Sequence, residues 1–219
     1  YGTSAMVPHN LTLTLLGAGL LWFGWFGFNA GSALSASEGA AMAFVVTHMA
    51  TAAAALSWIV MEWIIKGKPT TLGIASGAVA GLVAITPAAG FVGPVSSVII
   101  GLVAGAICYF AVLAKHSLKY DDALDVVGVH CVGGIWGAIA TGLFASKAIN
   151  SAGSDGLFFG NPGQLWTQII AVLVTMVYSF VVTLVILYII KAVVGLRVPE
   201  EDEFVGCDTS EHGENAYNI

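Results

Sequence analysis

Residues 166–195 read WTQIIAVLVTMVYSFVVTLVILYIIKAVVG, and Lys191 is the only charged residue in this stretch. A helix of about 20 mostly apolar residues crosses the ~30 Å hydrocarbon core of a bilayer. A longer run can cross at a strong tilt or extend beyond the membrane surface. The stretch therefore predicts a long transmembrane helix and places the chain among membrane proteins.

Five further apolar runs reach the length of a membrane span. They cover roughly 11–34, 38–65, 70–90, 95–114 and 122–146. Because few residues remain between them, we expect one membrane domain at 1–196 with six transmembrane helices. The polar residues 197–219 are expected to form a tail. The predicted fold class is all-α, a polytopic membrane helix bundle.

The composition agrees with this fold class and excludes others. Hydrophobic residues make up 58% of the chain and charged residues 9%, whereas roughly a quarter of residues are charged in globular proteins. With a net charge of −6, the chain is neither a disordered polymer, nor a nucleic-acid-binding protein, nor an ordinary cytosolic enzyme. Cys108, Cys131 and Cys207 form no C-x-x-C pair, so we predict neither a disulfide framework nor a zinc site.

The basic residues set the expected orientation, because lysine and arginine collect in cytoplasmic loops. Six of the seven follow the second, fourth and sixth predicted spans: Lys66, Lys68, Lys115, Lys119, Lys191 and Arg197. Lys147 falls on the other side. We therefore expect both termini, the 66–70 turn and the 115–121 loop inside, and the 147–165 loop outside.

Glycines mark the expected contacts between helices. Gly73, Gly77 and Gly81 form two overlapping G-x-x-x-G steps, and Gly101 with Gly105 forms another. Small residues at this spacing let helix backbones approach closely in membranes. The fifth run carries Gly128, Gly133, Gly134, Gly137 and Gly142. We therefore predict the compact body of a transporter or channel, with the glycine-poor run 166–195 facing lipid or a neighbouring subunit.

Two histidines fall inside predicted spans, where an ionisable side chain is costly and usually functional. At helical spacing, the residues beside His130 are Gly134, Gly137 and Thr141. We interpret this narrow face as the wall of a passage in which a neutral imidazole hydrogen-bonds a substrate. The alternative is a buried histidine that bonds a backbone carbonyl. His48 has no glycine-lined face, and there we favour this alternative.

The first predicted span ends in the aromatic stretch LWFGWFGFNAGSAL, residues 21–34. Its residues Trp25, Phe28, Asn29 and Ser32 are spaced to share one helix face near the outer surface. Aromatic rings with a hydroxyl can hold a small cation by cation–π attraction and a hydrogen bond. An aromatic belt at the membrane interface is the alternative. The accompanying glycines, Gly24, Gly27 and Gly31, favour a packed interior face over a belt.

Three acidic residues, Asp121, Asp122 and Asp125, form a D-D-x-x-D motif at the inner start of the fifth span. This spacing can hold Mg²⁺ against a diphosphate, as an intramembrane prenyltransferase requires. Such an enzyme needs a second acidic cluster, and the other acidic residues of the membrane region, Glu38, Glu62 and Asp155, are not paired. Capping of the helix N-terminus explains the motif more simply. The chain also lacks a P-loop, a G-x-S-x-G elbow and an H-E-x-x-H motif, so we predict neither an enzyme nor a cofactor.

Several long segments of the chain resemble the ammonium transporter (Amt/Mep/Rh) family, in its bacterial or archaeal Amt form. They are VPHNL, GWFGFNAGSA, EWIIKGKPTTLGIASGAVAGLVAITPAAGFVGP, DDALDVVGVHCVGGIWG, GLRVPEEDEF and SEHGENAY. The resemblance runs nearly from end to end. It implies a fold of eleven spans, built from two inverted five-helix repeats and a long terminal helix, and a homotrimer with one pore per subunit.

On this resemblance, the six predicted spans are the sixth to the eleventh of the family fold. Inverted repeats place the substrate path at their interface, so this chain supplies one wall of its pore. The chain starts at Tyr1 without a signal peptide, and we expect it to be trimmed or incomplete. The N-terminal half of the fold, with the first pore histidine and the other gate phenylalanine, is then missing.

The resemblance assigns roles to four positions. His130 matches the second member of the family's pore histidine pair, and Phe28 matches one of two stacked gate phenylalanines. Ser32 matches the hydroxyl of the outer ammonium-recruiting site, and Trp25 matches a pore-side aromatic residue of the same helix. These residues are predicted to recruit NH₄⁺, or methylammonium, and to conduct NH₃ past the histidines with or without a relayed proton.

The resemblance also implies a place in the cell and a partner. It predicts a multi-pass protein of the cell (inner) membrane, surrounded by lipid, with a cytoplasmic C-terminus. The tail carries an acidic cluster at 200–203, and in this family the cytoplasmic face binds PII-type signal proteins. A tail that is merely solvated is the simpler reading. The alternative function is an ammonium-sensing membrane module that uses the same site for signalling.

Overall fold

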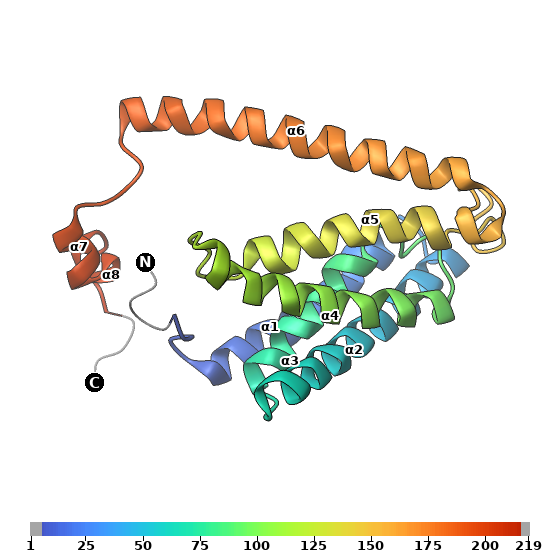
Figure 1. Ribbon diagram of the computed structural model, residues 1–219, viewed down its shortest axis with the longest axis horizontal. Helices are drawn as coiled ribbons and strands as arrows, with labels where there is room; N and C mark the ends of the chain where they lie inside the picture. The colour runs from blue at the N-terminus through green and yellow to red at the C-terminus, as the bar shows by residue number, and fades with distance from the viewer. Residues whose placement is uncertain (1–5, 216–219) are drawn as a thin grey trace. The chain divides into compact units, whose positions relative to one another are not determined.

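The computed structural model describes residues 6–215, so residues 1–5 and the last four residues of the predicted tail lie outside it (Figure 1). Its elements are α1 (Leu11–Gly31), α2 (Glu38–Lys66), α3 (Thr71–Ile85), α4 (Pro94–Leu118), the π-helical turn η1 (Val127–Cys131), α5 (Val132–Phe144), the 3₁₀ turn η2 (Leu157–Phe159), α6 (Pro162–Val193), α7 (Glu200–Val205) and α8 (Cys207–Ser210). Residues 6–215 contain no strand. The predicted all-α class is confirmed.

Polar side chains fix where the first three helices begin. The side chain of Asn10 accepts a hydrogen bond from the Leu13 amide, and the Ser37 and Thr70 side chains do the same for α2 and α3. Such caps satisfy backbone N–H groups that have no partner inside the helix. α2 ends at Gly67, whose φ of 77° lies in the left-handed region that glycine adopts without strain.

The third predicted span, 70–90, is helical over a shorter range than expected. α3 ends at Ile85, and residues 86–91 form turns. Pro87 has no N–H to donate to the preceding helical turn, and the Thr86 amide already bonds the Val83 carbonyl at 3.3 Å in a tightened geometry. The proline therefore stops the helix while the sequence stays apolar.

The fifth predicted span, 122–146, begins later than its apolar run. Asp125 adopts a left-handed conformation with φ of 57°, so regular helix starts after it, in η1. The Asp122 carboxylate accepts hydrogen bonds from the Val126 and Val127 amides at 2.9 and 2.8 Å. Residues 122–125 are thus a capping segment that precedes the helix.

Five helical segments are long and apolar enough to cross a membrane, counting η1 and α5 together as Val127–Phe144. α3 has 15 residues, which at 1.5 Å per residue extend over about 22 Å. A bilayer core is ~30 Å thick. The crossing of the membrane by this sixth segment stays a prediction.

α2 is the central helix of the bundle, and it packs against α1, α3 and α4. The predicted glycine steps face it. A Cβ atom added to Gly77 or Gly81 of α3 would overlap α2, and one added to Gly101 or Gly105 of α4 would overlap the carbonyls of Ala50 and Ala54. These helices therefore approach at backbone distance, as small residues permit in membranes.

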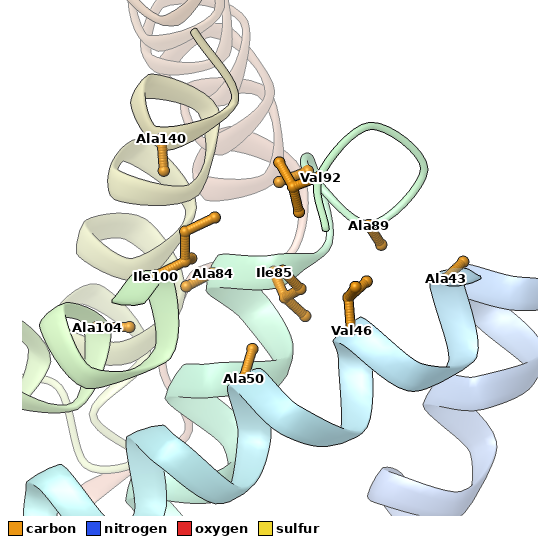
Figure 2. Close-up of a cluster of buried hydrophobic side chains, with 11 residues drawn as sticks. Ala43, Val46, Ala50, Ala84, Ile85, Ala89, Val92, Ile100, Ala104 and Ala140 are labelled. Atoms are coloured by element: carbon orange, nitrogen blue, oxygen red, sulfur yellow. The ribbon is translucent and has the colours of Figure 1, made fainter. Parts of the chain in front are cut away.

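The core where α2, α3, α4 and α5 meet is built from small side chains. Seven of its eleven buried residues are alanine, and Val46, Ile85, Val92 and Ile100 fill the remaining space. Figure 2 shows these side chains gathered between the helices and the loop after α3, which carries Ala89 and Val92. In lipid, helices associate largely through such van der Waals packing, because the bilayer core is as apolar as the side chains.

The connections between helices gather at two opposite ends of the bundle. The Ser146 amide donates to the Phe91 carbonyl at 2.9 Å, which joins the 86–93 and 145–156 loops. At the other end, the Lys66 ammonium lies 5.6 Å from the centroid of the Tyr109 ring, in the C-terminal half of α4. Lys66 and Lys147 thus lie at different ends, as the basic residues predict.

The close contact at Gly101 gives a test of this packing. Because an alanine Cβ would meet the backbone of Ala50, Gly101→Ala is expected to lower the thermal midpoint of the detergent-solubilised protein by about 5 °C. Gly134→Ala is the matched control, since a Cβ there meets nothing within 4 Å. The midpoint is measured by size-exclusion chromatography of heated samples. Equal midpoints for the two variants would contradict the packing.

The chain from Leu173 onward forms a second compact unit, which begins inside α6. The α6 side chains from this point are largely exposed and apolar. Beyond α6, the Arg197 guanidinium donates to both carboxylate oxygens of Glu203 at 2.5 and 2.7 Å. These hydrogen bonds hold the pKa of the Glu203 carboxyl below its usual value. One member of the acidic cluster is therefore paired within the tail.

Candidate functional site

The aromatic residues at the end of α1 lie together, as predicted. The rings of Trp25 and Phe28 meet edge to face with their centroids 5.6 Å apart, and Phe28 is 60% exposed. They border an open apolar groove along α1 that is also lined by Gly17, Leu20, Leu21 and Gly24. This arrangement presents aromatic surface that is not used for packing inside the described chain.

Ser32 lies one helical turn beyond Phe28 and is exposed. Its hydroxyl donates to the Phe28 carbonyl at 2.6 Å. A serine hydroxyl has one hydrogen and two acceptor lone pairs, so this bond leaves the oxygen to accept from another donor. The end of α1 therefore combines an exposed aromatic ring with a hydroxyl oriented as an acceptor.

The indole of Trp25 is held in place by a hydrogen bond to Thr86. Its Nε1 donates to the Thr86 hydroxyl at 2.7 Å, and that hydroxyl donates to the Leu82 carbonyl at 2.7 Å. This bond ties α1 to the end of α3 and satisfies the indole N–H, which usually finds a partner when covered. The spacing of Trp25 in the sequence carried no signal for Thr86, which is 61 positions away.

Asn29 does not share the exposed face with Trp25, Phe28 and Ser32, so this prediction was wrong. Its side chain is buried, and its Nδ2 donates to the Thr47 hydroxyl of α2 at 3.0 Å. A position one residue after Phe28 is turned about 100° around the helix, which directs it toward α2. Asn29 thus serves the attachment of α1, and sequence reasoning missed this role and that of Thr47.

The glycines of α1 do not mark a packed face within the described residues. Cβ atoms built on Gly24, Gly27 and Gly31 would meet nothing within 4 Å. The expectation of an interior face is therefore not met by residues 6–215. The three glycines therefore form an exposed strip of α1 without side chains, next to the aromatic rings.

His130 is exposed and lies within the π-helical turn η1. Such wide turns inside helices occur frequently at functional sites. Gly134, one turn later, faces open space, whereas Gly137 packs against the Ala84 carbonyl and Thr141 is buried. The glycine-lined strip beside His130 is therefore shorter than predicted, because the far end of α5 is used for packing on α3.

The structure does not bring His130 into contact with the α1 residues. α1 and α5 both pack against α3 but not against each other within the described chain. The two halves of the predicted site thus stand on separate helices of one bundle, with α3 between them.

His48 lies on α2 against another face of α1, and its side chain is exposed, so the prediction of a buried histidine was wrong. Its ring lies 5.2 Å from that of Trp22 and 6.1 Å from that of Phe26, measured between centroids. Phe26 in turn stacks on Phe44 at 3.9 Å. These rings join α1 to α2 beside the Asn29 bond.

Two residues of the D-D-x-x-D motif, Asp122 and Asp125, make contacts that serve the fold. Asp122 caps η1, and the Asp125 carboxylate pairs with the buried Lys115 ammonium. Residues 6–215 contain no group of three or more histidine, cysteine, aspartate or glutamate side chains able to hold a metal ion. The capping interpretation thus accounts for Asp122, and the arrangement required of a prenyltransferase is not found among these residues.

The sequence profile of the Ammonium Transporter Family matches residues 2–217. The chain belongs to the ammonium transporter family. It is 54% identical over 98% of its length to an ammonium transporter of Bacillus subtilis, and 52% identical over 96% to ammonium transporter Amt1 of Archaeoglobus fulgidus. It covers 53% of each relative, so the chain spans about half the length of the curated relatives it matches.

Solved structures of the family share the fold. The chain superposes on Saccharomyces cerevisiae Mep2 with a TM-score of 0.85 and 38% identity, over 89% of this chain and 45% of that one. A structure described as a sensor Amt protein gives a TM-score of 0.85 with 34% identity, over 96% of this chain and 51% of that one. The predicted resemblance and helix-bundle fold are confirmed, and this member of the ammonium transporter family is an integral membrane protein.

Proposed function

We propose that this chain forms the sixth to eleventh spans of an ammonium transporter subunit and supplies one wall of its pore. The observation that carries the proposal is the end of α1, where the exposed Phe28 ring, the Trp25 indole and an acceptor-oriented Ser32 hydroxyl lie within two helical turns. This arrangement occurs in a chain whose relatives are named ammonium transporters.

The chemistry of these residues suits a small cation that carries N–H donors. Aromatic rings attract NH₄⁺ through their negative faces, and the Ser32 oxygen accepts one of its hydrogen bonds. Moving the bare cation into an apolar passage costs many kcal/mol unless its charge is removed. NH₄⁺ can lose a proton and continue as NH₃, whereas K⁺ cannot, so the same apolar wall admits the first and refuses the second.

His130 then serves the neutral molecule. Its exposed imidazole on η1 offers one donor and one acceptor nitrogen when uncharged. Both suit NH₃, which can accept and donate hydrogen bonds. The proton released by NH₄⁺ either returns to the outer solution or is relayed along the pore, and a net current during uptake distinguishes the second route from the first.

The assembly and location follow the family. The proposal is a homotrimer in the cell (inner) membrane, with the C-terminal ends of α2 and α4, which carry Lys66 and Lys115, on the cytoplasmic side together with the tail. A PII-type signal protein is the proposed partner at this face. The exposed apolar surfaces of α1 and α6 fit contact with lipid, with the N-terminal half of the fold or with a neighbouring subunit.

The test is uptake of labelled methylammonium by cells that produce a transporter of the relatives' full length with this sequence as its second half. Saturable uptake that excess NH₄⁺ inhibits, and excess K⁺ does not, is expected. A protein that reaches the membrane and shows no uptake would overturn the proposal.

The alternative is a sensor that binds ammonium without conducting it. This alternative is supported by the similarity of the chain to the structure described as a sensor Amt protein. Binding of methylammonium to the purified protein without flux into proteoliposomes would support the sensor, whereas flux supports the transporter.

A further inference from the structure

Two threonine hydroxyls, those of Thr47 and Thr86, accept hydrogen bonds from side chains of α1. In each, the hydroxyl gives its hydrogen to the backbone carbonyl four residues earlier, Thr47 to Ala43 at 2.6 Å and Thr86 to Leu82 at 2.7 Å. A hydroxyl has one hydrogen to donate. Each threonine oxygen is therefore left as an acceptor, and each accepts from a side chain of α1.

The two donors are one helical turn apart on α1. Asn29 Nδ2 donates to Thr47 on α2 at 3.0 Å, and Trp25 Nε1 donates to Thr86, the C-cap residue of α3, at 2.7 Å. The two bonds reach different helices from neighbouring turns. Together they fix both the position of α1 and its rotation about its own axis.

The rings of Trp22 and Phe26 also pack on His48 and Phe44 of α2, but most of the α1 surface is not held by packing in the described chain. Asn29 is the one buried residue of α1, and the five glycines of the helix would meet nothing within 4 Å if they carried a Cβ. α1 is also apolar over most of its surface, so lipid contact does not favour one rotation over another. Directional hydrogen bonds supply what packing leaves open here.

We propose that Thr86 and Thr47 are positioning residues of the substrate site. This inference rests on the proposed function. Thr86 sets the Trp25 indole, the edge contact at 5.6 Å carries that setting to the Phe28 ring, and Thr47 fixes the turn that ends at Ser32. Neither threonine touches substrate, and each acts through the α1 residue that it binds.

Thr86→Val keeps the shape of the side chain and removes the acceptor for the indole. In the full-length transporter, the KM for methylammonium is expected to rise about tenfold, the factor that one hydrogen bond to a covered donor supplies. The maximal uptake per molecule in the membrane should change less than twofold. Thr86→Ser keeps the hydroxyl and should restore the KM.

The matched control is Thr51→Val. Thr51 is buried in α2 and donates to the Thr47 carbonyl at 2.6 Å, but no α1 side chain donates to its hydroxyl. The Thr51→Val substitution should leave the KM for methylammonium unchanged. Thr47→Val breaks the second bond and should raise the KM as Thr86→Val does, which gives a second route if one variant folds poorly.

A double-mutant cycle shows whether Thr86 acts through Trp25. In a Trp25→Phe background the indole N–H is gone, so adding Thr86→Val should raise the KM no further. Equal increments in both backgrounds, or a KM that stays unchanged in Thr86→Val and Thr47→Val while the unmodified protein transports methylammonium, would overturn the positioning role.

The hydrogen bond itself can be measured without transport. The indole N–H proton resonance of Trp25, identified by its loss in Trp25→Phe, should move upfield in Thr86→Val and stay in place in Thr51→Val. A resonance that does not move would overturn the inference. Absence of methylammonium uptake by the unmodified protein, with the expected shift present, would count against the proposed function alone.

Discussion

Replacing His130 with alanine is expected to lower the selectivity of the full-length transporter for NH₄⁺ over K⁺ by roughly a hundredfold, equivalent to ~3 kcal/mol. The exposed imidazole on η1 provides the hydrogen bonds that a neutral NH₃ would need in an apolar passage. Alanine removes them and leaves space that water can enter, so a hydrated K⁺ gains a route. Currents and labelled methylammonium uptake in proteoliposomes measure both changes.

The control for this substitution is His48→Ala. His48 also lies in a membrane helix, but its ring packs on Trp22 and Phe26 between α1 and α2. Its loss should leave selectivity unchanged. Both variants should elute at the same volume as the unmodified protein in size-exclusion chromatography. If His130→Ala retains both uptake and selectivity, His130 has no part in conduction.

The sequence predicts the helices of this chain well because apolar length and caps are local signals. Asn10, Ser37 and Thr70 each stand immediately before a helix and accept a bond from its first turn. The glycine steps of α3 and α4 were also informative, since four-residue spacing places small residues on one face, and that face contacts α2.

Other features depended on contacts that spacing does not reveal. Asn29 belongs to the aromatic stretch by sequence, but its side chain is buried between α1 and α2, where it donates a hydrogen bond to Thr47. Trp25 depends on Thr86, whose place beside it follows from how α3 packs on α1 and from the stop at Pro87. The short helix spacings predict the residues of the candidate site, whereas they carry no signal for the two threonines that accept hydrogen bonds from Trp25 and Asn29.

The region before α5 shows the same limit. Asp122, as the cap of a helix, was within reach of sequence reasoning. The left-handed conformation of Asp125 could not be predicted from the local sequence. It accompanies a contact between the Asp125 carboxylate and Lys115, which lies ten positions earlier on α4. The start of η1 therefore lies beside a tertiary ion pair that its local sequence does not reveal.

Breaking this ion pair from the Asp125 side is expected to lower stability by roughly 3 kcal/mol, or about 6–12 °C in thermal midpoint. The Lys115 side chain is 6% exposed and also donates to the Asp122 carbonyl at 2.8 Å. Asp125→Asn removes the countercharge of this buried ammonium while keeping a side chain that tolerates φ of 57°. The midpoint of the detergent-solubilised protein checks the effect.

Lys115→Met should cost less than Asp125→Asn, since the Asp125 side chain is 32% exposed and water can solvate the carboxylate that remains. The double variant should be more stable than Asp125→Asn alone, because exchanging a buried ion pair for uncharged groups of similar size is often neutral. Asp121→Ala, at an exposed neighbouring carboxylate, should leave the midpoint within about 1 °C, the effect of an ordinary surface substitution. An additive double variant would show that the two side chains stabilise the start of η1 independently, and that the pair does not fix it.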